Sequence, residues 1–129
     1  MDRKKILIVD DEKDFIDTVA GRLALKGFEI IEAFNGKDGL EKAHTEKPDI
    51  ILLDLRMRPV SGFEVADSLR RTPGTSQVPI IAMSGYYTMK EHEFLMNVCG
   101  INKFLKKPIN PLETIAAIKH ILGEPQDDK

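Results

Sequence analysis

Four consecutive apolar residues, Ile50 to Leu53, end on the carboxylate of Asp54. Such an unbroken run is typical of a strand inside a parallel sheet, because both faces of that strand are covered and no polar alternation remains. Loop residues follow, and Ser61 with Glu64 three positions later matches a capping box that opens a helix. We therefore expect Asp54 where a central strand delivers its carboxyl end to the crevice in which open α/β sheets bind ligands.

The same strand-then-helix pattern repeats along the chain. Strands are expected at 4–9, 28–33, 50–54, 78–83 and 101–105, and helices at 12–26, around Leu40 and Ala43, and at 62–71, 88–99 and 110–122. Strict alternation predicts a parallel sheet with right-handed crossovers. The first, third and fourth strands are the most apolar and should be central. The expected fold is thus an α/β, flavodoxin-like doubly wound sheet of five strands in the order 2-1-3-4-5, with five helices. In the last helix, Leu112, Ile115, Ile118 and Leu122 are expected to form the buried stripe.

Length and composition narrow the class of protein. The 129 residues suit one domain, which we place at 1–123, followed by a polar tail at 124–129. Cys99 is the only cysteine, so no intrachain disulfide can form and a cytoplasmic location is the default; a small buried filler is its expected role. With a net charge of −2, the chain shows no excess of basic residues that would indicate binding to nucleic acid. No apolar run is long enough to span a membrane.

Polar groups stand at four predicted strand ends: Asp10 and Asp11, Asp54, Ser84 and Lys107. A parallel sheet brings these ends to one edge. Crowded carboxylates repel one another unless a cation lies among them, and a set of oxygen ligands suits Mg²⁺. A divalent ion, a hydroxyl and an ammonium around one carboxylate favour phosphoryl transfer, with the carboxylate itself as nucleophile.

Each residue has a simpler reading by itself. Asp10 or Asp11 can cap the first helix, Ser84 can belong only to a turn, and Lys107 can be a solvated strand end. The coincidence of all of them at one sheet edge favours a site. The three histidines fall within predicted helices, where surface or boundary roles are expected.

The chain resembles the receiver domain of two-component response regulators. The resemblance extends from about Lys4 to Leu122 and rests on Asp10-Asp11, Asp54 followed by Met57 and Gly62, Ser84, and the run Phe104-Leu105-Lys106-Lys107-Pro108. It implies a signalling domain that catalyses only its own phosphorylation and dephosphorylation. It also implies a histidine kinase or phosphotransfer protein as the phosphoryl donor, and a downstream protein partner or fused effector domain as the receiver of the signal, with no direct binding of nucleic acid or membrane.

The resemblance also assigns roles within the site. Asp54 is the implied phosphoacceptor. Asp11 and Asp54, with the backbone carbonyl of Arg56, are the implied ligands of Mg²⁺, and Asp10 assists through water. Lys107 is expected to pair with the phosphoryl group.

Two further residues are implied to carry the signal, with Ser84 as the switch hydroxyl and Phe104 as the aromatic gate. The output face is implied to consist of the fourth helix, fifth strand and fifth helix. The chain departs from the family pattern at Arg58, which stands where proline is usual, and at Phe104, which lacks the hydroxyl of the common tyrosine.

Three other classes of protein use comparable residues or the same fold. A phosphatase of the haloacid dehalogenase type needs a second aspartate two positions after the nucleophile, where this chain has Arg56. A flavodoxin needs a loop that cradles phosphate, and the predicted crevice is acidic instead. A binding module that never uses phosphate lacks nothing essential, and it ranks above these two and below the receiver.

Overall fold

The computed structural model describes residues 3–86 and 88–126. Five strands alternate with five helices in the order β1 (Lys5–Val9), α1 (Lys13–Leu25), β2 (Glu29–Ala33), α2 (Gly36–Glu46), β3 (Ile50–Asp54), α3 (Gly62–Arg71), β4 (Ile80–Ser84), α4 (Met89–Asn97), β5 (Lys103–Lys106) and α5 (Pro111–Leu122). The strands form one sheet in the order β2-β1-β3-β4-β5, and every neighbouring pair is parallel. The predicted fold class and strand order are confirmed.

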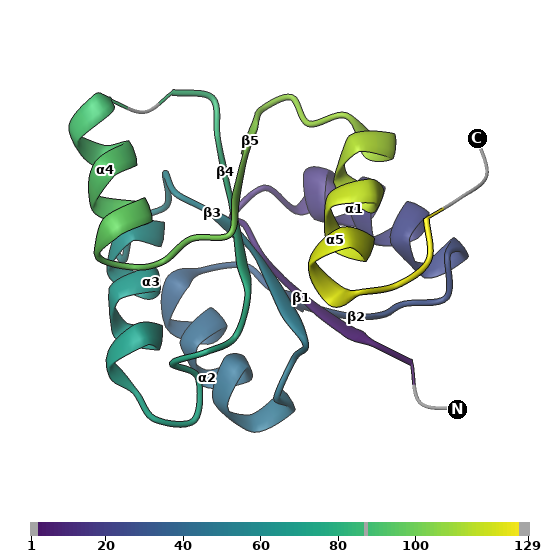
Figure 1. The fold of residues 1–129 in the computed structure, drawn as a ribbon, viewed down its shortest axis with the longest axis horizontal. Helices are drawn as coiled ribbons and strands as arrows, with labels where there is room; N and C mark the ends of the chain where they lie inside the picture. Colours follow the sequence, from purple (N-terminus) through teal and green to yellow (C-terminus); the bar gives the residue numbers. More distant parts are fainter. Residues whose placement is uncertain (1–2, 87, 127–129) are drawn as a thin grey trace.

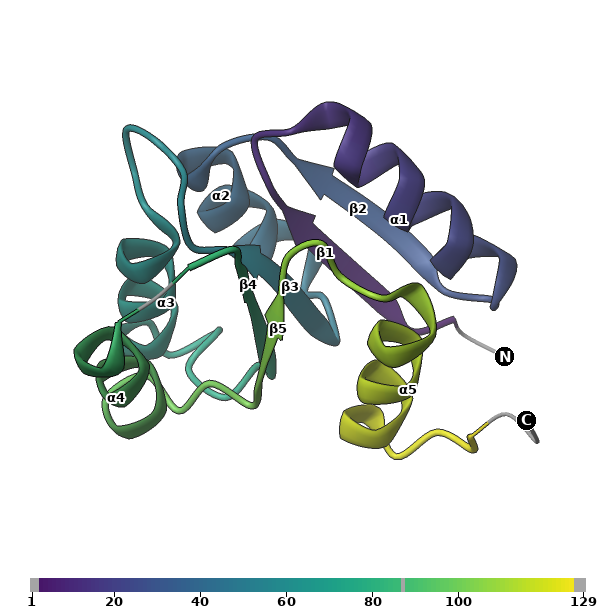
Figure 2. The same ribbon diagram turned by 90° about the horizontal axis from the view of Figure 1, so that it is seen from above.

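Helices cover both faces of the sheet. Helices α1 and α5 pack on one face, and α2, α3 and α4 pack on the other (Figures 1 and 2). Successive residues of a strand point to opposite faces. In β1, Ile6 and Ile8 therefore join the cluster beneath α1 and α5, whereas Leu7 and Val9 join the cluster beneath the other three helices. All four side chains are fully buried, which explains the unbroken apolar run.

Side-chain caps fix where most helices begin. Ser61 and Thr88 form complete capping boxes with Glu64 and Glu91, as predicted for Ser61. Asn110 accepts hydrogen bonds from two backbone N–H groups at the start of α5, just before a proline at the first helical position. Helix α1 differs, because its N-cap residue Glu12 makes no side-chain cap. The Asp10 carboxylate accepts the Glu12 N–H at 2.9 Å just before this helix.

The prediction of a buried Leu112 is wrong, because this side chain is 72% exposed. The buried residues of α5 are Thr114, Ile115, Ala117 and Ile118. A helix turns by about 100° per residue, so Leu112 points well away from the centre of that set. Spacings of three residues alone did not fix which side of the helix faces the sheet.

The limits of three elements differ by a few residues from the prediction. Strand β4 starts at Ile80 rather than at residue 78, because Val78 N–H donates to the Thr75 carbonyl in a turn. Helix α4 ends at Asn97, and Gly100 at φ +60° leads the chain out of it, so β5 begins at Lys103 and not at residue 101. In the predicted tail, the Gln126 side chain donates to the Ala116 carbonyl at 3.3 Å, and 127–129 lie outside the described residues.

No helix among residues 3–86 and 88–126 is long and apolar enough to cross a membrane.

Candidate functional site

The strand register brings the predicted polar groups to one edge of the sheet. Asp54 pairs with Met83, and Ser84 pairs with Lys106, so β3, β4 and β5 end nearly level. Asp10 directly follows β1, and its backbone N–H donates to the Ala33 carbonyl at 3.1 Å. The carboxyl ends of four strands thus deliver their polar residues to the crevice where open α/β sheets bind ligands.

Lys107 is the centre of an ion-pair network at this edge. Its Nζ lies 2.7 Å from Asp10 Oδ2, 3.4 Å from Glu12 Oε1 and 3.7 Å from Asp54 Oδ1. The ammonium also lies over the ring of Phe15, 4.4 Å from its centroid. Burial lowers the pKa of Lys107, but the hydrogen bond and charge of Asp10, together with the charge of Asp54, raise it further than burial lowers it. Lys107 therefore presents a permanent positive charge to the site.

Asp54 is a buried carboxylate with a perturbed acidity. Its side chain is almost inaccessible to solvent, and its Oδ1 accepts a hydrogen bond from the Arg56 N–H at 3.2 Å. Burial and the nearby charge of Asp10 raise the pKa of Asp54 to about 6, although the charge of Lys107 opposes this shift. Burial likewise raises the pKa of Asp10, against the hydrogen bond from Lys107. The three carboxylates of the site therefore carry more negative charge than the Lys107 ammonium neutralises.

Three carboxylates are close enough to share one cation. One oxygen from each of Asp10, Asp11 and Asp54 lies within 4.8 Å of the other two. Two of these residues are buried and Asp11 is exposed, so one side of the cluster stays open to water. Oxygen ligands with room for water match the preference of Mg²⁺, which keeps several waters when it binds to proteins. The donor set therefore fits the predicted ion.

The two predicted switch residues lie near the site but contact other groups. The Ser84 hydroxyl donates to the Tyr86 carbonyl at 2.6 Å and accepts from the Tyr86 N–H at 3.1 Å, so it is engaged by its own loop. The ring of Phe104 is half-buried and stacks on that of His92, with centroids 4.6 Å apart. Their switching roles remain predictions.

Sequence reasoning missed three residues of the site. Glu12 and Phe15 contact Lys107, and Glu91 forms an ion pair with Arg56 at 2.8 Å. In the sequence, Phe15 is simply one apolar residue of the first predicted helix. No local pattern relates any of these residues to its partner, because each pair is far apart in the sequence and meets only through the fold.

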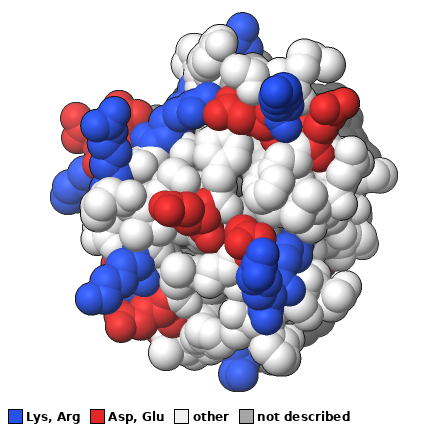
Figure 3. All heavy atoms as spheres, turned by 90° about the vertical axis from the view of Figure 1, so that its left-hand side faces the viewer, with Lys and Arg blue, Asp and Glu red and all other residues white. Residues whose placement is uncertain are grey.

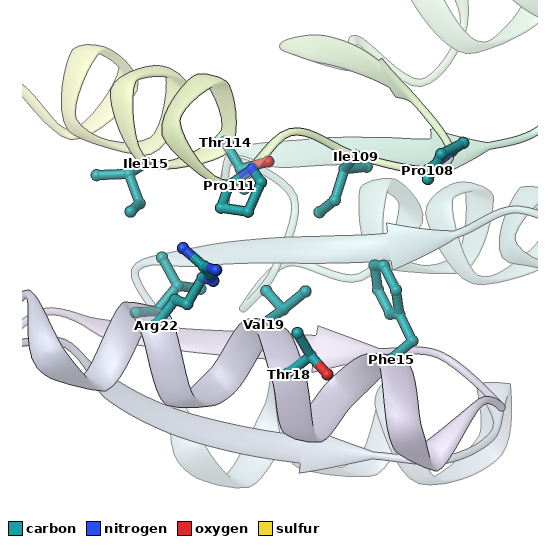
Figure 4. Close-up of a pocket in the computed structure, with 10 residues that line it drawn as sticks. Phe15, Thr18, Val19, Arg22, Pro108, Ile109, Pro111, Thr114 and Ile115 are labelled. Carbon is teal, nitrogen blue, oxygen red and sulfur yellow. The ribbon is translucent and has the colours of Figure 1, made fainter.

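An apolar pocket lies beside the site, between α1, α5 and the loop that follows β5 (Figure 4). It has a volume of about 140 Å³ and is lined by Phe15, Thr18, Val19, Arg22, Leu23, Pro108, Ile109, Pro111, Thr114 and Ile115. Phe15 links the pocket to the site, since its ring also contacts Lys107. The opposite side of the molecule, which carries α3 and α4, mixes acidic, basic and uncharged surface (Figure 3).

A sequence model described as the response regulator receiver domain matches residues 6–119. This chain belongs to the response regulator receiver domain family. Members act in two-component signalling and are signalling domains rather than classical enzymes. The match covers both the acidic cluster and Lys107.

Known proteins similar to this receiver domain agree with that assignment. The alkaline phosphatase synthesis transcriptional regulatory protein PhoP of Bacillus subtilis is 37% identical over 122 residues, which are 92% of this chain and 48% of that protein. The polar-differentiation response regulator DivK of Brucella anthropi is 31% identical over 121 residues, 94% of this chain and 98% of its own length. The chain thus spans about half the length of several curated relatives and nearly all of DivK.

Solved structures show the same fold. A CheY-like receiver domain protein of Methanospirillum hungatei superposes with a TM-score of 0.87 at 28% identity, covering 95% of both chains. The chemotaxis protein CheY4 of Vibrio cholerae gives a TM-score of 0.86 at 25% identity and is covered over 99% of its length, with 93% of this chain.

Proposed function

We propose that Asp54 accepts a phosphoryl group from a phosphohistidine of a sensor histidine kinase or phosphotransfer protein. The observation that carries this proposal is the position of Asp54, a buried carboxylate beside the Lys107 ammonium and two further carboxylates. With a pKa of about 6, Asp54 is mostly ionised at neutral pH and can act as a nucleophile.

The reaction is a single transfer. One oxygen of Asp54 bonds to phosphorus while the phosphorus–nitrogen bond of the donor histidine breaks, and the electron pair of that bond stays on the imidazole. Asp10, Asp11 and Asp54, with the backbone carbonyl of Arg56, would hold Mg²⁺, which supplies positive charge beside the phosphoryl oxygens. Lys107, which directly follows β5 at the same edge of the sheet, supplies a second positive charge.

The acyl phosphate carries a charge of about −1.5 to −2, where the ionised Asp54 carried −1. Lys107, which already contacts Asp10, then also pairs with the phosphoryl group, and the Ser84 hydroxyl leaves the Tyr86 carbonyl to donate to a phosphoryl oxygen. Phe104 turns inward into the space that Ser84 vacates. These movements alter the surface of α4, β5 and α5, which signals to a downstream protein or to a fused effector domain.

The donor protein has to approach the carboxyl edge of the sheet, and we assign the apolar pocket between α1 and α5 to it. The pocket is continuous with the site through Phe15, which contacts Lys107. A Thr18→Glu variant, at an exposed position of the pocket rim, should slow transfer from the phosphorylated kinase and leave labelling by acetyl phosphate unchanged. Equal transfer rates would contradict this assignment.

A cytoplasmic location is part of the proposal, because kinase and receiver have to meet.

Incubation with acetyl phosphate, followed by intact mass measurement, tests the proposal. We expect a gain of one phosphoryl group that needs Mg²⁺ and is absent in Asp54→Asn. A folded protein that gains no phosphoryl group with Mg²⁺ would favour a binding module that does not use phosphate.

A further inference from the structure

The Tyr86 carbonyl is a shared acceptor between the switch serine and an arginine. The Ser84 hydroxyl donates to it at 2.6 Å, and the Arg56 guanidinium donates to it from Nη2 at 3.0 Å and from Nε at 3.2 Å. Arg56 belongs to the loop that follows β3, whereas Tyr86 belongs to the loop that follows β4. One carbonyl therefore connects the loop beside Asp54 with the loop that leads to α4.

The same guanidinium also holds the first turn of α4. Its Nη2 lies 2.8 Å from Glu91 Oε1, and its Nη1 lies 3.2 Å from Glu91 Oε2. This is the bidentate geometry of a strong arginine–carboxylate pair. Glu91 in turn accepts the Thr88 N–H at 2.8 Å and so completes the capping box of α4. The guanidinium carbon also lies 5.4 Å from the ring centroid of Phe63, within the range of a cation–π contact.

We propose that Arg56 is a positioning residue that latches the start of α4 to the loop after β3 before phosphorylation, and that the latch opens when Ser84 turns toward the phosphorylated Asp54. This inference rests on the proposed phosphorylation. Ser84 and Tyr86 exchange two hydrogen bonds, so rotation of the hydroxyl toward Asp54 breaks both and leaves Arg56 alone on the Tyr86 carbonyl. A contact made in one state and lost in the other biases the equilibrium toward the first.

The latch differs in effect from an ordinary surface ion pair. It spans two loops and a helix cap, so its loss should loosen a helix that is remote in sequence from Arg56. Exposed ion pairs contribute little, and we expect opening of the first turn of α4 to become about two- to fivefold more frequent.

Hydrogen exchange of the unphosphorylated protein tests this inference. The amides to follow are those of Glu91 and His92, which bond to the Thr88 side chain and carbonyl. Glu91→Gln is the most specific variant for this test, because glutamine can still complete the capping box while the ion pair with Arg56 is lost. We expect faster exchange of both amides in Glu91→Gln and in Arg56→Gln. The double variant should exchange no faster than Arg56→Gln alone, because the arginine substitution already removes the contact with Glu91.

Glu93→Gln is the matched control, because it removes the same charge from an exposed position of the same helix. Its exchange should equal that of the wild type. Additive effects of the two latch substitutions, or α4 amides that exchange alike in all variants, would overturn the inference.

Treatment of the wild type with acetyl phosphate and Mg²⁺ completes the test. It should raise exchange of the two amides, and the latch variants should show a smaller rise. Failure of Asp54 to be labelled would refute the proposed function through intact mass, whereas the comparison of unphosphorylated variants tests the latch contacts separately.

Discussion

Lys107 and Asp10 stand 97 residues apart in the sequence, and their side chains meet at 2.7 Å. Asp10 is fully buried, and the Lys107 side chain is 17% exposed. A buried carboxylate without a partner is strongly unfavourable, so this pair allows Asp10 to remain charged beside Asp54. The pair also leaves the cluster with two more carboxylates than the one ammonium can neutralise.

Replacement of Lys107 by methionine should destabilise the protein at neutral pH. The substitution leaves Asp10 buried without its ammonium partner, and we expect a loss of about 2–4 kcal/mol in the free energy of unfolding. Urea unfolding at pH 7.5 measures it. Lys106→Met, one residue earlier at an exposed position of β5, is the control and should change stability little. Equal unfolding free energies for the two variants would contradict the role of the ion pair.

The raised pKa of Asp54 predicts that Asp54→Asn stabilises the protein. The pKa of Asp54 is about 6 in the fold and 3.8 for an ordinary aspartate, so the folded state holds the proton more tightly than the unfolded chain. The charge of Asp54 therefore opposes folding increasingly as pH rises from about 4 to 6, and fully above that range. We expect a gain of roughly 1–3 kcal/mol at pH 7.5.

The gain should shrink when unfolding is measured at pH 4.5, where most of the native protein keeps the proton on Asp54. Asp14→Asn, at an exposed position of α1, should give no gain at either pH. A gain from Asp54→Asn that is independent of pH would point to packing rather than charge.

Magnesium should lower the pKa of Asp54 and raise stability. A divalent cation near the three carboxylates relieves their repulsion, and binding to the folded state alone adds to the free energy of unfolding. An NMR titration of the Asp54 carboxyl, with MgCl₂ or with NaCl at equal ionic strength, measures the shift. We expect a lower pKa only with MgCl₂, and a smaller effect in Asp11→Asn. Identical titrations in both salts would exclude the proposed cation site.

Gly62 should tolerate no side chain. A Cβ at this position would lie 2.6 Å from Leu55 Cα and in still closer contact with the Asp54 carbonyl oxygen. Gly62→Ala should therefore destabilise the protein by about 2 kcal/mol or more and displace the end of β3. Gly85→Ala is the control, because nothing lies within 4 Å of its added Cβ. If both alanine variants unfold at the same denaturant concentration, the close packing of Gly62 has no energetic consequence.

The sequence alone predicts the parts of this molecule that follow from strand periodicity. Parallel strands bring their carboxyl ends to one edge, so the sequence alone predicts that Asp10, Asp54 and Lys107 meet. The prediction of a cation site and of phosphoryl transfer follows from the types of these residues and their positions at the strand ends. Ser61 and its capping box were predictable for the same reason, because the motif is local.

Side-chain choices between distant elements could not be predicted. The Ser84 hydroxyl has several possible partners, and only the loop conformation directs it to Tyr86. The pairing of Arg56 with Glu91 depends on how α4 sits against the sheet. Leu112 shows the same limitation, since an apolar residue in the first turn of a helix can lie on either side of the buried face.

Trapping of the phosphorylated residue tests the central claim most directly. Acetyl phosphate and Mg²⁺ are added to the wild-type protein, the acyl phosphate is reduced with borohydride, and the modified peptide is sequenced by mass spectrometry. We predict conversion of Asp54, and only Asp54, to homoserine. Conversion at Asp10 or Asp11, or phosphorylation that resists borohydride, would contradict the assignment of Asp54 as the phosphoacceptor.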